Sequence, residues 1–308
     1  SNSSAGTFML LTTSLIWGLA FSLQRQGTQF LDAISFNGLR FIIAGFTLIP
    51  VIFLFDFFNK KRGNNHIGWN KSTILGGVFC GVLIFIGNNL QQMGLQTTTA
   101  GKASFISALY IVIVPLIGMF MRKKTAMTGW FAVLIAIAGF WTMSVNDNFE
   151  ITDGDILVLL CAFIFAFHIT VIGIFAEDAD PIRLTFLQFF VASALSVPTM
   201  AINGFPTGAN IEACILPLLY VGILSSGLGF TLQTMGQQRT DASTATLLLS
   251  LESVFGLFGG IIILHEQATP KELLGCILVF LAVILAEQKP YHKFLQFKNC
   301  NSKLLRCR

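Results

Sequence analysis

The side chains of this sequence that could do chemistry are ionisable groups set in long apolar stretches. Glu252 lies within the apolar run 242–264 and His168 within the run 155–176, each near the middle. Charged groups are costly to remove from water, so each needs either a partner or a task. A carboxylate or an imidazole in such a place could exchange a proton, and the alternative is a structural hydrogen bond across the fold.

Polar side chains recur at helical spacing in two neighbouring runs. Ser107 follows Ser104 by three residues, and Gln92 follows Asn88 by four. Residues three or four apart share one face of a helix, and a polar face in an apolar environment must contact protein or a wet cavity. Trp17 either stacks on a solute in that cavity or fills the core. The candidate residues for binding a polar solute are Trp17, Asn88, Gln91, Gln92, Ser107, Tyr110, His168 and Gln233.

The composition indicates that the apolar runs cross a membrane. Of 308 residues, 54% are hydrophobic and only 11% are charged, whereas about 25% of a soluble domain is charged. The runs are continuous and do not alternate between polar and apolar residues, which disfavours a membrane β-barrel. We therefore expect an all-α integral membrane protein whose outer surface contacts the lipid bilayer.

Ten runs are long enough to be transmembrane helices, because a span takes about 20 apolar residues. They cover residues 5–24, 34–57, 72–97, 101–121, 127–146, 155–176, 184–203, 212–237, 242–264 and 271–288. If all ten cross, most of the 19 Lys and Arg residues lie on the side of the N-terminus. Basic loops face the cytoplasm, so we expect a multi-pass protein of the cell membrane with both termini in the cytoplasm.

The sequence repeats itself. LQQMGLQTTTA at 90–100 returns as LQTMGQQRTDA at 232–242, 142 residues later, and LIWGLAF at 15–21 matches FIFAFHI at 163–169 with a shift of 148. This divides the chain into a first repeat at 1–148, a second at 149–290 and a basic cytoplasmic tail at 291–308. Five helices is an odd number, so the second repeat enters the membrane from the opposite side, as in many secondary transporters.

The inverted repeat also predicts where the two similar segments lie. Gln91 and Gln96 approach the outer face, whereas Gln233 and Gln238 approach the cytoplasm. We expect the two segments to form matching elements of an outer and an inner gate.

The sequence resembles the drug/metabolite transporter superfamily, in particular the EamA-type carriers with ten helices. The similarity rests on LIWGLAF at 15–21, FNGLRFIIAG at 36–45, LQQMGLQTTTAGKASFISALYIVIVPL at 90–116, CAFIFAFHI at 161–169 and LESVFGLFGGIIILHEQ at 251–267. The last segment departs from the family pattern, because Ser253 replaces a proline and His265 a glycine. The resemblance implies two repeats around a central substrate cavity, and a structural role for Glu252, which members with different substrates share.

Arg40 is a third ionisable residue within a span. It lies about six residues, or roughly 9 Å, into its helix at 1.5 Å per residue. A long basic side chain at that depth can extend to the membrane interface, and the resemblance implies that arginine here is a family trait. We therefore expect Arg40 to anchor the helix near the outer interface.

Taken together, these features predict a secondary transporter that moves a small metabolite by alternating access. An amino acid or a related compound is the best candidate substrate, export the expected direction and the proton the candidate coupling ion. The first alternative is an uncoupled facilitator or channel. An intramembrane enzyme is a remote one, since LSSG at 224–227 lacks the first glycine of a Gly-x-Ser-Gly turn.

Other partners are not expected. The sequence contains no P-loop and no cofactor fingerprint. Its six cysteines form no CxxC motif. We therefore predict no catalytic residues, no metal, no cofactor and no nucleic acid partner, and the sequence leaves the oligomeric state open.

Overall fold

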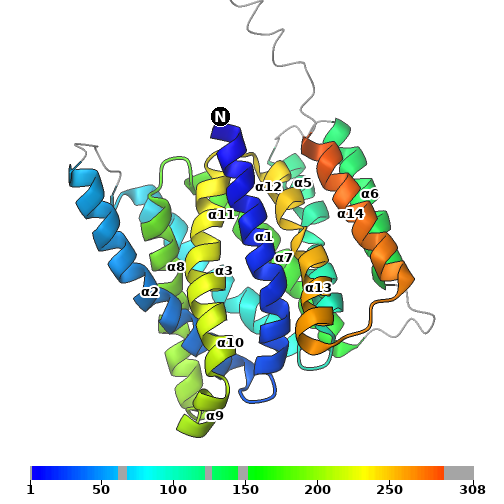
Figure 1. The fold of residues 1–308 in the computed structure, drawn as a ribbon. Coiled ribbons are helices and arrows are strands. Elements are labelled where there is room, and N and C mark those ends of the chain that lie inside the picture. The colour runs from blue at the N-terminus through cyan, green and yellow to red at the C-terminus, as the bar shows by residue number, and fades with distance from the viewer. Residues whose placement is uncertain (1, 62–67, 122–126, 145–151, 288–308) are drawn as a thin grey trace, which may run out of the picture.

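The fold was analysed in a computed structural model that describes residues 2–61, 68–121, 127–144 and 152–287. The described residues form helices and no strands, packed as a bundle of roughly antiparallel elements (Figure 1). Eight helical segments among them are long and apolar enough to cross a membrane, and two shorter apolar helices lie at 130–139 and 273–282. The all-α membrane fold is therefore confirmed, whereas the count of ten spans stays a prediction.

The first repeat contains six helices. They are α1 (Asn2–Gly27), α2 (Ala33–Lys61), α3 (Lys71–Gly94), α4 (Ala100–Ser107), α5 (Tyr110–Phe120) and α6 (Met127–Ser144). Local chemistry fixes where two of them begin. The Asn70 side chain accepts a hydrogen bond from the Thr73 amide at the start of α3, and the Thr99 hydroxyl accepts one from the Lys102 amide at the start of α4. Such caps satisfy amide groups that have no partner within the helix.

The second repeat contains the remaining elements. They are α7 (Asp153–Phe175), α8 (Pro181–Asn203), α9 (Gly208–Ala213), α10 (Ile215–Leu219), the π-helix η1 (Tyr220–Gly229), α11 (Phe230–Gln237), α12 (Ala242–Leu249), α13 (Glu252–Leu264) and α14 (Pro270–Glu287). A capping box formed by Thr152 and Asp155 starts α7. The expected span 212–237 thus breaks at Cys214 and then continues as one helical run to Gln237, whose middle part is a π-helix.

Two further spans are interrupted, and they are interrupted at equivalent places. The run 101–121 breaks after Ser107, so that Tyr110 begins α5, and the run 242–264 breaks after Leu249, so that Glu252 begins α13. Tyr110 and Glu252 are 142 residues apart, the spacing of the sequence repeat. Each broken helix therefore places a polar side chain at the first position of its second piece.

The two repeats enter the bundle from opposite ends. Gly6, at the start of α1, faces Gly236 in α11. Arg25, at the far end of α1, donates a hydrogen bond to the Leu95 carbonyl, next to the place where Gly94 faces Gly154 at the start of α7. Because α1 joins the two ends, segments 90–100 and 232–242 lie at opposite ends of the bundle, as the inverted repeat predicts (Figure 1).

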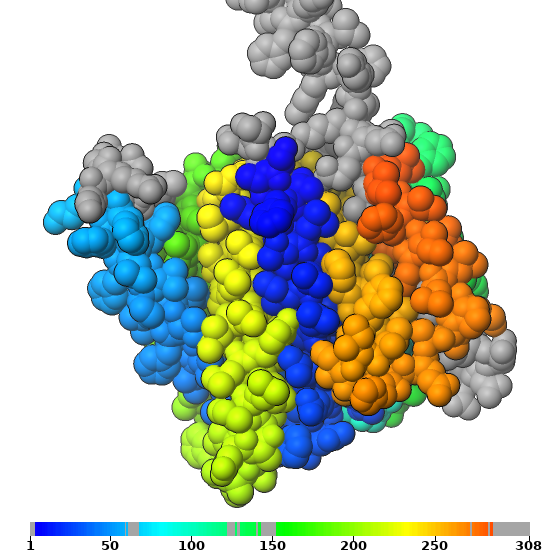
Figure 2. Space-filling view, viewed as in Figure 1, coloured from blue at the N-terminus to red at the C-terminus, as the bar shows by residue number. Residues whose placement is uncertain are grey.

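Helix α1 lies at the junction of the two halves. Figure 2 shows it (blue) between α11 (yellow) on one side and α13 (orange) on the other, and it contacts both. Large apolar side chains cover the outer surface, as expected of a face that contacts lipid. Phe46, Phe53 and Phe120 are among the most exposed of them.

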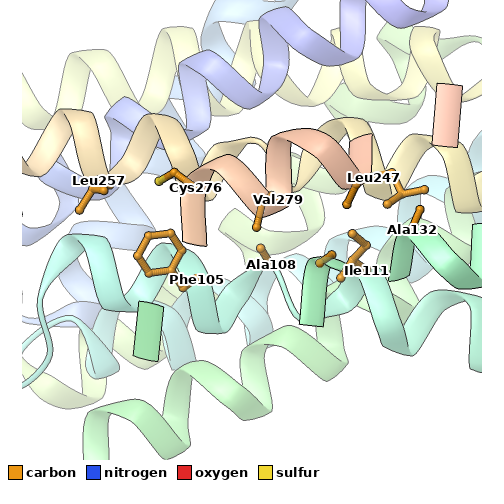
Figure 3. Close-up of a cluster of buried hydrophobic side chains, with 10 residues drawn as sticks. Phe105, Ala108, Ile111, Ala132, Leu247, Leu257, Cys276 and Val279 are labelled. Carbon is orange, nitrogen blue, oxygen red and sulfur yellow. The ribbon is translucent and has the colours of Figure 1, made fainter. Parts of the chain in front are cut away.

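Helices α6 and α14 pack beside the broken helices rather than around the centre. Phe105, Ala108 and Ile111 of the first repeat meet Leu247 and Leu257 of the second, with Cys276 and Val279 of α14 against them (Figure 3). The contact is entirely apolar, so it joins the repeats without contributing polar groups to the centre.

His265 ends α13 in a left-handed conformation, with φ of 56° and ψ of 31°. An L-residue with a side chain adopts this region reluctantly, and glycine adopts it freely. The resemblance noted in the sequence implies a glycine at this position, and glycine would suit this turn. The turn forms here with histidine in its place.

Candidate functional site

A cavity with a largely apolar wall and several polar side chains lies at the centre of the bundle, between the two repeats. It is lined by Trp17, Ala20, Phe21, Gln24, Arg40, Asn88, Gln91, Tyr110, Phe165, His168, Ile169, Ser225, Phe230, Gln233 and Glu252. Its volume is about 30 Å³, whereas a single ordered water needs about 10–15 Å³. In this conformation the cavity accommodates a few waters at most, so a larger solute requires its walls to separate.

The lining follows the internal repeat closely. Twelve of the lining residues form six equivalent pairs, with a shift of 148 in α1 and α7 and of 142 in the later helices. The pairs are Trp17 with Phe165, Ala20 with His168, Phe21 with Ile169, Asn88 with Phe230, Gln91 with Gln233, and Tyr110 with Glu252. The cavity therefore straddles the axis that relates the repeats, where an inverted-repeat transporter binds its substrate.

One of these pairs meets across the axis. The Tyr110 hydroxyl donates a hydrogen bond of 3.0 Å to Glu252 Oε1, and both side chains are buried. The carboxylate thus has a neutral donor as its partner. This contact joins the first position of α5 to the first position of α13.

The two equivalent glutamines have different surroundings. Gln91 Nε2 donates a hydrogen bond of 3.2 Å to Ser107 Oγ. Gln233 is fully buried, and neither its amide nitrogen nor its amide oxygen has a partner. Because buried polar groups are nearly always satisfied, Gln233 is a strong candidate for contacting a bound solute.

Arg40 is held inside the bundle by four neutral oxygens. Only 2% of its surface is exposed, so the expectation that its side chain extends to the membrane interface is wrong. The helix turns the guanidinium towards the cavity instead. Nε donates to Ser226 Oγ at 2.6 Å, Nη1 donates to Gln24 Oε1 at 3.0 Å and Asn88 Oδ1 at 2.9 Å, and Nη2 donates to Ser225 Oγ at 3.3 Å.

Aromatic and imidazole rings form the adjoining wall. The Trp17 and Phe230 ring centroids are 4.6 Å apart, and the His168 ring lies edge-on to Phe230 at 5.6 Å. Trp17 Nε1 donates to the Ser225 carbonyl at 3.0 Å, and His168 Nε2 lies 3.0 Å from Gln188 Oε1. Trp17 and His168 therefore each have a protein partner while lining the cavity.

Two of the expected solute-binding residues lie behind the cavity wall. Gln92 donates to the Gln24 carbonyl at 3.0 Å, and Ser107 accepts from Gln91. Both are buried and position a lining residue.

Sequence reasoning also missed lining residues. Gln24 and Ser225 bind Arg40 and line the cavity. Gln24 is a polar residue near the end of an apolar run, and Phe165 is the repeat equivalent of Trp17, so both left a signal in the sequence. Ser225 and Ser226 belong to the LSSG segment at 224–227, which was considered only as an incomplete protease motif.

The segments expected to form gates lie at opposite ends of the bundle, and Gln91, Gln92, Gln233 and Gln237 within them are buried. At one end Thr98 Oγ1 donates to Asp155 Oδ1 at 2.7 Å, and Lys102 Nζ lies 2.6 Å from Asp155 Oδ2. At the other end Gln238 Nε2 donates to the carbonyl oxygens of Ala176 and Ala179. The first segment therefore ties the first repeat to α7 of the second, whereas the second segment is tied to the loop after α7 within its own repeat. The gating role stays a prediction.

Comparison with known proteins identifies the family. The model of the EamA-like transporter family matches residues 4–145 and again residues 152–287. This chain belongs to the EamA-like transporter family. It is 31% identical over 280 residues to an uncharacterized transporter of Archaeoglobus fulgidus, covering 90% of this chain and 83% of that one. The two matches show that the chain is a membrane transporter built from two EamA repeats.

More distant relatives of this transporter share its length and fold. The biotin transporter of Escherichia coli is 22% identical over 289 residues, covering 91% of this chain and 92% of that protein. A solved crystal structure superposes with a TM-score of 0.71 at 17% identity, over 92% of this chain and 96% of the other. That likeness shows the shared fold alone.

Proposed function

We propose that this EamA transporter moves a small metabolite, an amino acid or a related compound, out of the cell by alternating access. The observation that carries the proposal is the central cavity, whose lining comes in equivalent pairs from the two inverted repeats. Rocking of one repeat against the other opens such a site to each side in turn.

The chemistry of the lining supports a small polar substrate. The walls combine amides, hydroxyls and aromatic rings with only three ionisable side chains besides Tyr110, namely Arg40, His168 and Glu252. Two amide atoms of Gln233 have no protein partner. A substrate with both hydrogen-bonding groups and an apolar part suits this lining, because a few placed polar groups in an apolar pocket give specificity.

Glu252 is the group we assign to proton coupling. It is the carboxyl group among the residues that line the cavity. Its hydrogen-bond partner is the neutral Tyr110 hydroxyl and not a cation. A carboxylate in that setting can carry a proton through the membrane, which is the common task of acidic groups in transporters. His168 is the second candidate.

The test is flux from proteoliposomes loaded with the twenty amino acids, read by mass spectrometry with and without a proton gradient. We expect one or a few amino acids to leave faster than from protein-free vesicles, and a gradient to accelerate them. Glu252→Gln should remove that acceleration by about tenfold or more while exchange without a gradient persists. Glu212→Gln, at an exposed position of the short helix α9, is the matched control.

Two results would contradict separate parts of the proposal. If flux through the parent protein is the same with and without the proton gradient, proton coupling is contradicted and the protein is an uncoupled facilitator. A protein that moves no amino acid at all has another substrate class.

A further inference from the structure

The guanidinium of Arg40 has no counter-ion among the described residues. The four acceptors around it are neutral amide or hydroxyl oxygens. The ion pairs found in the described ranges join Lys102 or Arg183 to aspartates, and none reaches Arg40. Glu252 lines the same cavity but bonds to Tyr110. A buried charge without an opposite charge is unfavourable, even when hydrogen bonds satisfy its donors.

The internal repeat shows that the fold does not require this charge. The residue equivalent to Arg40, 148 positions later, is Gln188. Gln188 is buried, contacts His168 and does not line the cavity. Helices α2 and α8 therefore pack in equivalent places with an arginine in one repeat and a neutral amide in the other. The charge of Arg40 is a property of the cavity and not of the packing.

The hydrogen bonds of Arg40, a cavity-lining residue, leave one N–H donor of its guanidinium unused. Nη2 has a single bond, to Ser225 Oγ at 3.3 Å, which is the longest of the four. A guanidinium carries five N–H donors, and four of its hydrogen bonds are accounted for. Ser225 itself lines the cavity. An anionic oxygen arriving from the cavity could therefore bind Nη2 without displacing Gln24, Asn88 or Ser226.

We propose that the transported metabolite carries a carboxylate, and that Arg40 binds this carboxylate while Gln233 binds a polar group at the other end of the molecule. This inference rests on the proposed function and names the chemistry that its substrate must have. The substrate carboxylate supplies Arg40 with the ion-pair partner that the described residues do not give it, and charge-assisted hydrogen bonds are among the strongest in proteins.

The position of Gln233 gives the second contact. Ser226 of η1 binds Arg40, and Gln233 lies seven residues later in α11, where it lines the cavity. Its unpartnered amide can both donate and accept, so it suits an amine, a hydroxyl or an amide on the substrate. Because Arg40 and Gln233 come from different repeats and line one cavity, the two contacts suit two different polar groups of one small molecule.

The first test compares acids with their neutral amides on the purified protein. The ligands are the twenty amino acids and their carboxamides, with biotin and biotinamide as a second type of acid. The readout is the melting temperature, which a ligand raises when it binds the folded state. At least one acid should raise it, and its amide should bind about tenfold more weakly or worse. The proposal is overturned if no acid binds, or if amides bind as well as their acids.

The second test supplies the missing carboxylate from the protein. Asn88 Oδ1 accepts from Arg40 at 2.9 Å, so Asn88→Asp places a negative charge on the guanidinium. The affinity of the Asn88→Asp protein for the acids should fall to the affinity that the parent protein has for the amides. The variant should remain folded. Asn89→Asp is the control, because Asn89 donates to the preceding turn in the same way as Asn88 but contacts Asn37 instead of Arg40.

The proposal is judged by comparing acid binding to the Asn88→Asp variant with acid binding to the parent protein. Asn88→Asp protein that binds acids as tightly as the parent would overturn it. If this variant does not fold, the comparison of acids and amides on the parent still decides.

Binding and flux separate this inference from the proposed function. Acids that bind without crossing the proteoliposome membrane would contradict transport of these compounds and leave the carboxylate site intact. Flux of a metabolite that has no carboxylate, with no acid bound, would support transport and overturn the site.

Discussion

In the first repeat Gln91 is held by Ser107, whereas in the second repeat the equivalent Gln233 has no partner for either amide atom. The two repeats differ at the position that supplies the partner of Gln91. The position equivalent to Ser107, 142 residues later, is Leu249, which offers no hydrogen bond. The same backbone arrangement thus produces a fixed amide on one side of the cavity and an unsatisfied one on the other.

The same contrast extends to the charged groups. Arg40 corresponds to Gln188, and Tyr110 corresponds to Glu252. The first repeat therefore has a cation and a phenol at these two positions. The second repeat has a neutral amide and a carboxyl group at the equivalent positions. The inverted repeat gives the two sides of the cavity equivalent backbones, and under the proposed function we expect the substrate to be recognised at the positions where the repeats differ. Three further changes would break or sharpen this comparison.

The largest effect is expected where the helix backbones approach each other most closely. A Cβ on Gly94 would lie 2.7 Å from the Gly154 carbonyl oxygen, whereas a Cβ on the equivalent Gly236 would lie 3.3 Å from the Gly6 carbonyl oxygen. Backbone cannot move aside as a side chain can, so Gly94→Ala should cost about 1–3 kcal/mol of stability. Gly236→Ala should cost less, since its closest contact is the Leu10 side chain at 2.6 Å.

The measurement is thermal or denaturant unfolding of both glycine variants in detergent. Equal losses would show that the two ends of the bundle are packed alike, contrary to the structure.

A smaller effect is expected for the two glutamines. Gln91→Leu leaves the Ser107 hydroxyl without its donor and should destabilise the protein by about 1 kcal/mol. Gln233→Leu removes two buried polar atoms that have no partner, so stability should stay unchanged or rise while substrate binding weakens. Melting temperatures with and without a bound substrate measure both. A Gln233→Leu protein that loses stability as Gln91→Leu does would remove the contrast between the repeats.

The smallest effect is expected at the ends of the bundle. Lys102 and Asp155 form an ion pair of 2.6 Å, and the equivalent of Lys102 in the second repeat is Thr244. The lysine is 28% exposed, so Lys102→Met should cost less than about 1 kcal/mol. The loss should shrink at high salt, which screens such a pair. Arg239→Met is the control, because the exposed Arg239 bonds the Met235 carbonyl of its own turn. A loss that salt does not change would argue against an ion pair.

Much of the candidate site could be predicted because polar residues are rare in this chain. Asn88, Gln91, Tyr110, His168, Gln233 and Glu252 were chosen for being polar within apolar runs, and all six line the cavity. Gln92 and Ser107 met the same criterion but lie behind the wall, since a polar side chain in lipid-embedded protein can be satisfied by a neighbour as well as by a cavity. Sequence alone does not distinguish the two.

The errors came from orientation around the helix axis. The expectation for Arg40 used only its position along the helix, and that position does not say which way the side chain points. Ser225 lies in the π-helix η1, whose turn is wider than 3.6 residues, so regular spacing could not predict that it faces Arg40.

The sequence by itself determined that this chain is a helical membrane protein with an inverted repeat, because apolar run length and the recurrence of Gln, Gly and Thr are properties of residue order. It also determined which side chains would be costly to bury. Only the tertiary structure decided which of them meet, because partners such as Tyr110 and Glu252, or Arg40 and Ser226, lie far apart along the chain. Their contacts depend on how two repeats pack around one axis, and that arrangement is set by the summed packing of all the helices.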